Sequence, residues 1–117
     1  MALAQGTDIL VLDEPTTYLD LAHQLEILLL LERLNKAENR TIVMVLHDLN
    51  HASRFSDYLI AMKDGKVIKE GTPSDVMTCE VLREVFNIDA QLAPCPFSAH
   101  PICFSYQLCK DVEYVYR

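Results

Sequence analysis

Two short, unbroken apolar runs constrain the fold of this chain more than any other feature. The first run is Ile9–Leu12, and the second lies within Thr41–Leu46. Runs of this length without polar alternation are typical of strands that are buried on both faces in a parallel sheet. A leucine-rich segment with helical spacing, which Asp20 can cap, separates them and extends to about residue 34. Residues 8–46 are therefore predicted to form a strand–helix–strand unit in a parallel sheet.

The rest of the chain predicts antiparallel pairing and short helices. A short helix is expected over residues 49–55, followed by strands at residues 58–62 and 67–70 that an Asp-Gly turn connects. Thr72 and Thr78 can cap two short helices, the second of which ends near residue 86. From Ile88 onward, prolines and β-forming residues indicate a peripheral hairpin and a tail. The predicted fold class is α/β, with a parallel sheet, a C-terminal antiparallel hairpin and short helices.

The charge balance and the apolar content exclude several classes of protein. The chain has 10 lysines and arginines against 17 aspartates and glutamates, a net charge of −7, and half of its residues are hydrophobic. Such a chain can form one globular domain at most, and its carboxylates repel the phosphates of nucleic acid. Its apolar runs fall far short of the roughly 20 residues that a spanning helix needs. Because no basic leader follows Met1, we expect a cytosolic protein with reduced cysteines.

Polar side chains directly follow both predicted strands. Asp13 and Glu14 come after the first strand, and His47 comes after the second. In an open α/β sheet, ligands bind outside the carboxyl ends of the strands, so these side chains are expected at one edge. One carboxylate can hold Mg²⁺ near phosphate oxygens while its neighbour orients an attacking water, and a histidine can donate to a terminal phosphate. The structural alternatives are an acidic loop and a helix-capping or solvated histidine.

These residues belong to a longer pattern that resembles a known family. The run Ile-Leu-Val-Leu-Asp-Glu-Pro-Thr-Thr-Tyr-Leu-Asp at residues 9–20, followed by Val-Leu-His-Asp-Leu-Asn at residues 45–50, resembles the Walker B, D-loop and switch-histidine motifs of ATP-binding cassette (ABC) ATPases. Further matches at residues 65–66, 70–73 and 82–86 most resemble the ATPase subunits of bacterial importers for ferric siderophores, ferric citrate and related iron chelates. The resemblance covers residues 1 to about 93.

The resemblance implies a role for each of these residues. Asp13 would hold Mg²⁺, often through water, Glu14 would be the catalytic base, and His47 would contact the γ-phosphate of ATP. Asp20, in the D-loop, would reach across a dimer to the phosphate loop of the partner. The implied partners are a second ABC ATPase subunit in a homodimer, transmembrane permease subunits and, indirectly, an extracytoplasmic solute-binding protein. Such a subunit is cytoplasmic, lies peripherally on the inner face of the cell membrane and binds no nucleic acid.

The sequence lacks the phosphate-binding loop that such an ATPase needs. That loop requires glycines at both ends of G-x-x-x-x-G-K-[ST], and the three glycines of this chain do not have that spacing. The glutamine loop and the Leu-Ser-Gly-Gly-Gln signature are absent as well, and Met1–Gln5 resembles the end of the helix that follows the signature. We therefore expect residues 1–117 to be the C-terminal part of one ABC ATPase domain, a truncated P-loop NTPase, with residues 88–117 as its peripheral hairpin and tail.

Two classes of function stay open at the level of sequence. In the first, the parent protein hydrolyses ATP to drive import, and the isolated 117-residue chain is inactive because it cannot grip the triphosphate. In the second, the chain is a catalytically inactive fragment that acts only as an oligomerising or binding module. The exposed sheet would drive such association, because truncation leaves a hydrophobic edge and a hydrophobic face open. A role in DNA repair or translation is a weaker third option within the same family.

Three further features have structural explanations that we prefer to functional ones. His47 and His51 have the spacing of a zinc-protease helix, but His47 ends a strand. The leucine run at residues 28–31 predicts a helix buried on two sides rather than an interaction surface. Small buried thiols explain a second candidate zinc cluster, which lacks a C-x2-C pair. Its members are Cys95, His100, Cys103 and Cys109.

Overall fold

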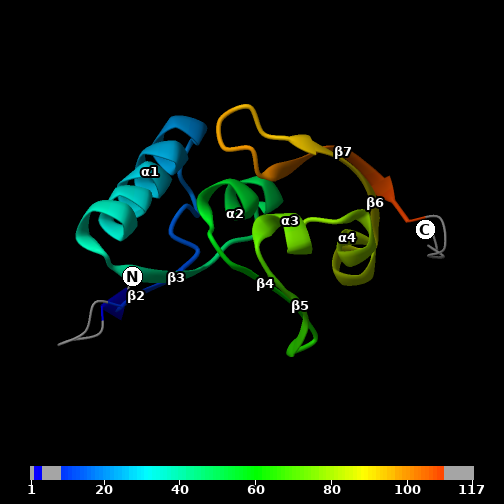
Figure 1. Cartoon of the computed structure of the whole chain (residues 1–117), viewed down its shortest axis with the longest axis horizontal. Coiled ribbons are helices and arrows are strands. Elements are labelled where there is room, and N and C mark those ends of the chain that lie inside the picture. Colours follow the sequence, from blue (N-terminus) through cyan, green and yellow to red (C-terminus); the bar gives the residue numbers. More distant parts are fainter. Residues whose placement is uncertain (1, 4–8, 110–117) are drawn as a thin grey trace. The chain divides into compact units, whose positions relative to one another are not determined.

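The computed structural model describes residues 2–3 and 9–109 and divides the chain into two compact units. The first unit is Met1–Asp48 and the second is Leu49–Arg117. Each unit contains its own strands and helices (Figure 1). No helix in the described part of the chain is long and apolar enough to cross a membrane.

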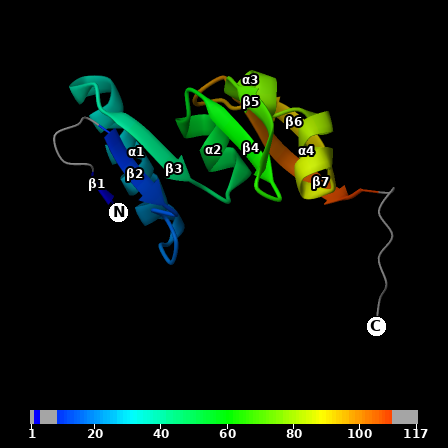
Figure 2. The same cartoon turned by 90° about the horizontal axis from the view of Figure 1, so that it is seen from below.

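A parallel strand pair with a helix on one face forms the first unit. β2 (Ile9–Asp13) and β3 (Thr41–Val45) keep one register along their whole length, and α1 (Leu21–Glu38) connects them. Figure 2 shows α1 lying along this strand pair. Leu10 and Leu12 of β2 pack against Leu31 of α1 in the core. The predicted strand–helix–strand unit is therefore confirmed.

Side-chain and backbone caps define the two ends of α1. The carboxylate of Asp20 accepts a hydrogen bond from the backbone N–H of His23 at 2.9 Å, which satisfies a free donor of the first turn. At the other end, Asn39 is left-handed (φ 53°) and its N–H bonds to the carbonyl of Leu34. The helix therefore extends beyond the predicted end near residue 34 and ends at Glu38. Its end is set by the Asn39 cap, whereas the prediction placed it at the last apolar residue of the helical pattern.

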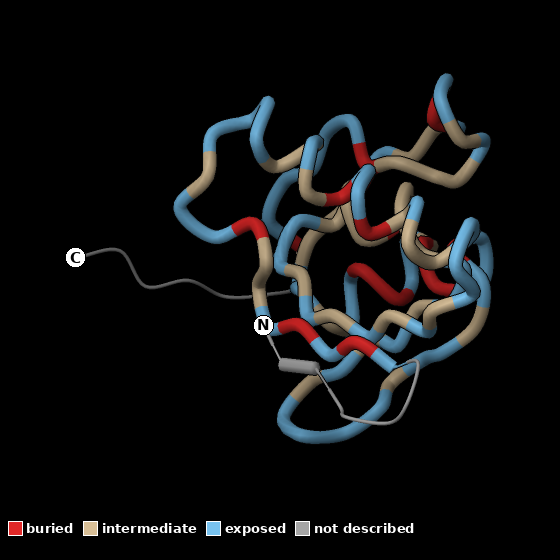
Figure 3. Tube along the Cα trace, turned by 90° about the vertical axis from the view of Figure 1, so that its left-hand side faces the viewer, coloured by how far each residue is buried: buried red, intermediate tan, exposed pale blue. Residues whose placement is uncertain are grey.

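The sheet face opposite α1 is apolar and open. Buried and exposed residues alternate along β2. Figure 3 colours the described residues of the chain by their burial. Ile9, Val11, Val43 and Val45 share the open face and are 41–54% exposed. We call these four residues the open face. The expectation that a hydrophobic face stands open is confirmed.

The leucine run of α1 is buried on one side only. Leu28 is fully buried, whereas Leu29 and Leu30 are 44% and 46% exposed. The prediction of burial on two sides is therefore wrong for the described residues. The physical reason is that α1 covers one face of a strand pair and has no described layer of this unit on its outer side.

A short strand replaces the helical end that was expected near the N-terminus. β1 (Ala2–Leu3) pairs antiparallel with β2, with Ala2 opposite Val11 and Leu3 opposite Leu10. The free edge of β2 offers unpaired backbone groups, which favour such a partner. At Ala2–Leu3 the helical expectation is wrong, and the rest of Met1–Gln5 lies outside the described residues.

Hairpins and short helices make up the described part of the second unit. Its elements are α2 (Leu49–Phe55), β4 (Leu59–Lys63), β5 (Lys66–Gly71), α3 (Pro73–Val76), α4 (Cys79–Phe86), β6 (Ile88–Pro94) and β7 (Pro101–Leu108). β4 and β5 turn at Asp64 and Gly65, whose positive φ values (53° and 76°) suit a tight hairpin. β6 and β7 form the second antiparallel pair. The predicted tail at residues 110–117 lies outside the described residues.

Threonines begin both helices that follow the first hairpin. Thr72 and Asp75 form a capping box, in which each side chain accepts a hydrogen bond from the backbone N–H of the other. Gly71 precedes the box with φ +151°, and a Cβ there would lie 2.8 Å from Oδ2 of Asp75, so only glycine leaves room. Thr78 caps α4 by accepting from the backbone N–H of Val81 at 3.2 Å.

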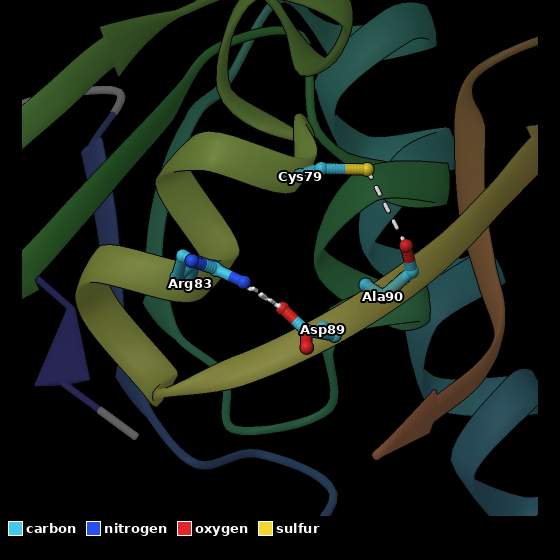
Figure 4. Close-up of polar contacts among 4 residues, drawn as sticks. All are labelled: Cys79, Arg83, Asp89 and Ala90. Carbon is cyan, nitrogen blue, oxygen red and sulfur yellow. Dashed lines mark hydrogen bonds and ion pairs between the residues drawn. The ribbon is translucent and has the colours of Figure 1, made fainter. Parts of the chain in front are cut away.

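The core of the second unit joins α4 to the second hairpin. Polar contacts reinforce this packing: Arg83 pairs with Asp89 at 2.7 Å, and the thiol of Cys79 donates to the carbonyl of Ala90 at 3.3 Å (Figure 4). The buried residues of this core are Met77, Leu82, Ala90 and Cys103.

Polar side chains of α2 hold the backbone of β7. Asn50 donates to the carbonyl of Cys103 at 3.0 Å and accepts from its N–H at 2.7 Å. The fully buried hydroxyl of Ser53 donates to the carbonyl of Pro101. These bonds satisfy backbone groups at an edge where β7 has no neighbouring strand in the described residues.

Candidate active site at the ends of strands β2 and β3

The two parallel strands end together, and their last residues bring the predicted polar side chains to one edge. Asp13 is the last residue of β2 and lies opposite Val45, the last residue of β3. Glu14 follows directly, and its N–H donates to the carbonyl of Val45 at 3.0 Å. Glu14 has a positive φ of 52°, which turns the chain away from the sheet at this point.

The carboxylate of Glu14 is held from two sides. Its Oε1 is buried and lies 2.7 Å from Nε2 of His47, the residue that follows β3 by two positions. Its Oε2 accepts a hydrogen bond from the hydroxyl of Thr17 at 3.3 Å. The side chain of Glu14 is 24% exposed, whereas that of His47 is 83% exposed. The expectation that both strands deliver polar groups to the same edge is confirmed for Glu14 and His47.

A tight turn connects Glu14 to the start of α1. The N–H of Thr17 bonds to the carbonyl of Glu14 at 3.2 Å, and that of Leu19 bonds to the carbonyl of Thr16 at 3.3 Å. Thr16 is buried, while Tyr18 has a positive φ of 67° and a fully exposed ring. Thr17 is not among the site residues that the sequence predicts. The signal that could have found it is its place three residues after the carboxylate, in a turn that Pro15 favours.

Asp13 offers a free carboxylate at the sheet edge. It is exposed and makes no hydrogen bond or ion pair within the described part of the chain. Mg²⁺ in nucleotide-binding sites is held by one or two carboxylates together with substrate phosphates. A single unpaired carboxylate beside Glu14 therefore fits a Mg²⁺ that needs phosphate oxygens to complete its coordination.

Asp20 is the N-cap of α1, as its position in the sequence predicts. Besides the N–H of His23, its carboxylate contacts the imidazole Nδ1 of the same residue at 3.0 Å. Both side chains are more than half exposed, so the carboxylate is accessible from outside this unit.

The two zinc alternatives find no support in the described residues, which contain no group of three or more histidines, cysteines and acids that could hold a metal. The ring of His51 packs edge-on against Phe55, with centroids 6.3 Å apart. Cys95 and Cys103 are buried free thiols, in agreement with the prediction. The backbone N–H of Phe97 and the hydroxyl of Ser98 hold the pKa of the Cys95 thiol below its ordinary value.

Comparison with known proteins defines the class to which this arrangement belongs. No family model matches the chain. It is 28% identical to a metal-chelate type ABC transporter in an inward-facing conformation, with a TM-score of 0.69 over 84% of this chain and 40% of that one. It is 40% identical to a dimeric ATP-binding cassette bound to ADP and phosphate, with a TM-score of 0.53 over 56% of this chain and 28% of that one. The chain therefore belongs to the ATP-binding proteins of ABC transporters.

Two curated relatives of the chain are named as ATP-binding proteins of iron(3+)-hydroxamate import and of siderophore transport. Over 111 residues the chain is 64% identical to the iron(3+)-hydroxamate import ATP-binding protein FhuC of Bacillus subtilis. This alignment covers 95% of this chain and 41% of the relative. The chain is 52% identical to the probable siderophore transport system ATP-binding protein YusV of the same organism, over 91% of this chain and 38% of the relative. The chain thus spans about two fifths of the length of these relatives.

Proposed function

We propose that this chain carries the catalytic carboxylate of an ATP-hydrolysing subunit that drives import of an iron chelate. The single observation that carries the proposal is the Glu14–His47 pair, 2.7 Å apart at the ends of two parallel strands. The carboxyl edge of a parallel sheet is where such folds bind their ligands. The similarity to ATP-binding proteins of siderophore and hydroxamate importers supports the choice of substrate class.

Each site residue takes a role that its position allows. Glu14 accepts the proton of the water that attacks the γ-phosphate, because its carboxylate is fixed, largely buried and beside an open edge. His47 contacts the γ-phosphate, because its exposed ring is accessible to a phosphate oxygen. Asp13 would hold Mg²⁺, often through water, and a bound Mg²⁺ would neutralise charge on the phosphate oxygens.

The remaining roles extend beyond this chain. Asp20, exposed at the start of α1, reaches the phosphate loop of the other subunit in a homodimer. ATP and Mg²⁺ bind only in the complete domain, which supplies the phosphate loop that the 117 residues lack. The subunit works in the cytoplasm on the inner face of the membrane, with permease subunits and an extracytoplasmic solute-binding protein that choose the chelate.

A hybrid protein tests the proposal directly. In the hybrid, this chain replaces the matching segment of the iron(3+)-hydroxamate import relative of Bacillus subtilis. That relative supplies the rest of the domain. We expect the hybrid to hydrolyse ATP and Glu14→Gln to lower kcat by about 10²- to 10⁴-fold while nucleotide binding stays nearly unchanged. The matched control is Glu38→Gln, the same change at the exposed end of α1. Wild-type turnover in Glu14→Gln would exclude Glu14 as the base.

A second function is favoured by the open face of the first unit. Ile9, Val11, Val43 and Val45 leave an apolar surface that another protein layer can cover, so the isolated chain can act as an oligomerising or binding module. Calorimetric titration of the isolated chain with MgATP separates the two functions. A micromolar dissociation constant would show that the 117 residues hold nucleotide by themselves, whereas no binding together with self-association would support the module.

A further inference from the structure

The Glu14 carboxylate has a second partner that none of the predicted site residues accounts for. While His47 lies 2.7 Å from Oε1, the hydroxyl of Thr17 donates to Oε2 at 3.3 Å. The two contacts engage different oxygens, so together they fix both the position and the rotation of the carboxylate. The exposed imidazole comes from the end of β3, and the hydroxyl comes from the turn after β2.

The backbone of the turn holds the Thr17 hydroxyl in place. The N–H of Thr17 bonds to the carbonyl of Glu14 at 3.2 Å, so the two residues share a closed turn. The positive φ of Glu14 turns the chain at the start of this segment. Threonine is also stiff at χ1 because it is β-branched, which limits the directions in which its hydroxyl can point. The turn therefore limits where the hydroxyl donor of Thr17 can lie.

We infer that Thr17 is a positioning residue for Glu14, an inference that rests on the proposed function. In the proposed reaction His47 contacts the γ-phosphate, and a ring so engaged can no longer be the sole anchor of the carboxylate. Thr17 then keeps Oε2 fixed, so that Oε1 stays directed at the attacking water. A hydrogen bond of 3.3 Å is long for two oxygens, and catalytic hydrogen bonds of this kind tighten when substrate binds.

Two substitutions separate this role from a purely structural one. Thr17→Val keeps the β-branched shape but removes the donor, whereas Thr17→Ser keeps the donor and loses only a methyl group. A structural role would make both variants less stable and would change nucleotide binding and turnover together. A positioning role lowers kcat in the valine variant alone. Thr41→Val serves as the matched control, because Thr41 is an exposed threonine at the opposite end of β3.

The experiment measures ATP turnover and nucleotide binding in the hybrid protein. We expect Thr17→Val to lower kcat by about 10-fold, the lower end of the effect of a lost hydrogen bond to a charged group because this bond is long, with KM and the melting temperature unchanged. Thr17→Ser and Thr41→Val should both keep wild-type kcat. In the Glu14→Gln background Thr17→Val should cause no further loss, because Thr17 acts through Glu14.

Each outcome decides between the inference and the function on which it rests. Equal turnover in Thr17→Val and wild type, or an equal additional loss in the Glu14→Gln background, overturns the role of Thr17 and leaves the proposed function intact. A folded wild-type hybrid that binds ATP without hydrolysing it overturns the proposed function, and the role of Thr17 with it. A loss in the valine variant that serine rescues supports both.

Discussion

The first unit leaves one face of its sheet uncovered, whereas the second unit ties its helices to its strands with both apolar and polar contacts. In the first unit, one helix covers one side of β2 and β3, and the residues of the opposite face are 41–54% exposed. In the second unit, α4 and β6 share a core, and side chains of α2 hydrogen-bond to the backbone of β7. The carboxylates of the candidate site thus lie in the unit with the less complete core.

This difference follows from the kind of sheet in each unit. Parallel strands are built to be covered on both faces, so removing one layer exposes β-branched residues such as Val11 and Val43. Antiparallel hairpins tolerate a solvated face, so β4–β5 and β6–β7 can each pack on one side. A part of an α/β domain is therefore expected to lose stability first where its sheet is parallel.

The largest expected effect tests whether the two units unfold separately. Leu28 of α1 is fully buried, so Leu28→Ala should lower the free energy of unfolding of the first unit by about 2–5 kcal/mol. Because such a loss is comparable to the stability of a small domain, backbone amides of β2 and β3 should lose protection from hydrogen exchange. Amides of β6 and β7 should keep it. The control is Leu30→Ala, at a leucine that is 46% exposed. Equal loss of protection in both units would show that the chain unfolds as one.

The second prediction concerns self-association through the open face. Covering a half-exposed valine contributes about 1 kcal/mol, so Val11→Thr combined with Val43→Thr should weaken association of the 117-residue chain by at least about tenfold. Light scattering and sedimentation at low micromolar concentration measure the change. Ile60→Thr places the same kind of substitution on β4, where Ile60 is 56% exposed, and should leave association unchanged if the first unit is the contact. A wild-type chain that stays monomeric contradicts the prediction.

The sequence predicts the elements well and their boundaries less well. Apolar runs of four or five residues located β2 and β3 because a buried parallel strand needs continuous apolar residues. The end of α1 was missed because Asn39, a left-handed cap, determines it, and periodicity alone does not register a cap. β1 could not be predicted, since it depends on an unpaired strand edge that only the folded sheet provides.

The candidate site, like the fold, could be predicted from the sequence only in part. Residues at the ends of two adjacent parallel strands must lie at one edge, so the proximity of Glu14 and His47 could be predicted. The turn after Pro15 is a signal for Thr17, but its contact with Glu14 also depends on the positive φ of Glu14, which few non-glycine residues adopt. The roles of Asp13, Glu14, Asp20 and His47 in hydrolysis stay predictions until the hybrid protein is measured.

A third prediction tests the hydrogen bonds between the side chain of Asn50 in α2 and the backbone of Cys103 in β7. Asn50→Ala leaves the N–H and the carbonyl of Cys103 without these partners, which should lower the free energy of unfolding by about 1–3 kcal/mol. Asn50→Asp keeps an acceptor for the N–H but has no donor for the carbonyl, so it should fall between Asn50→Ala and wild type. Urea denaturation measures the loss, and hydrogen exchange at the Cys103 amide locates it. Gln91→Ala, at an exposed position of β6, is the control and should change little.

The smallest expected effect is a pH dependence of the Thr72–Asp75 capping box. Hydrogen bonds from the side chain and the backbone of Thr72 hold the pKa of Asp75 below its ordinary value of 3.8. Because the folded-state pKa is the lower one, the ionised carboxylate stabilises the second unit at neutral pH. That contribution is fully present above the unfolded-state pKa and is lost as the pH falls through the folded-state value.

Asp75→Asn makes this dependence measurable. The variant should be slightly less stable than wild type at neutral pH, and the gap between their urea midpoints should close as the solution is acidified below the ordinary pKa of the carboxyl. Glu38→Gln, at the exposed C-terminal end of α1, changes a carboxylate that caps nothing and should show no such closing gap. A gap of constant size down to acidic pH would mean that Asp75 acts through its shape and not through its charge. The box would then stabilise the second unit as the Asn50 contacts do, by satisfying backbone groups independently of pH.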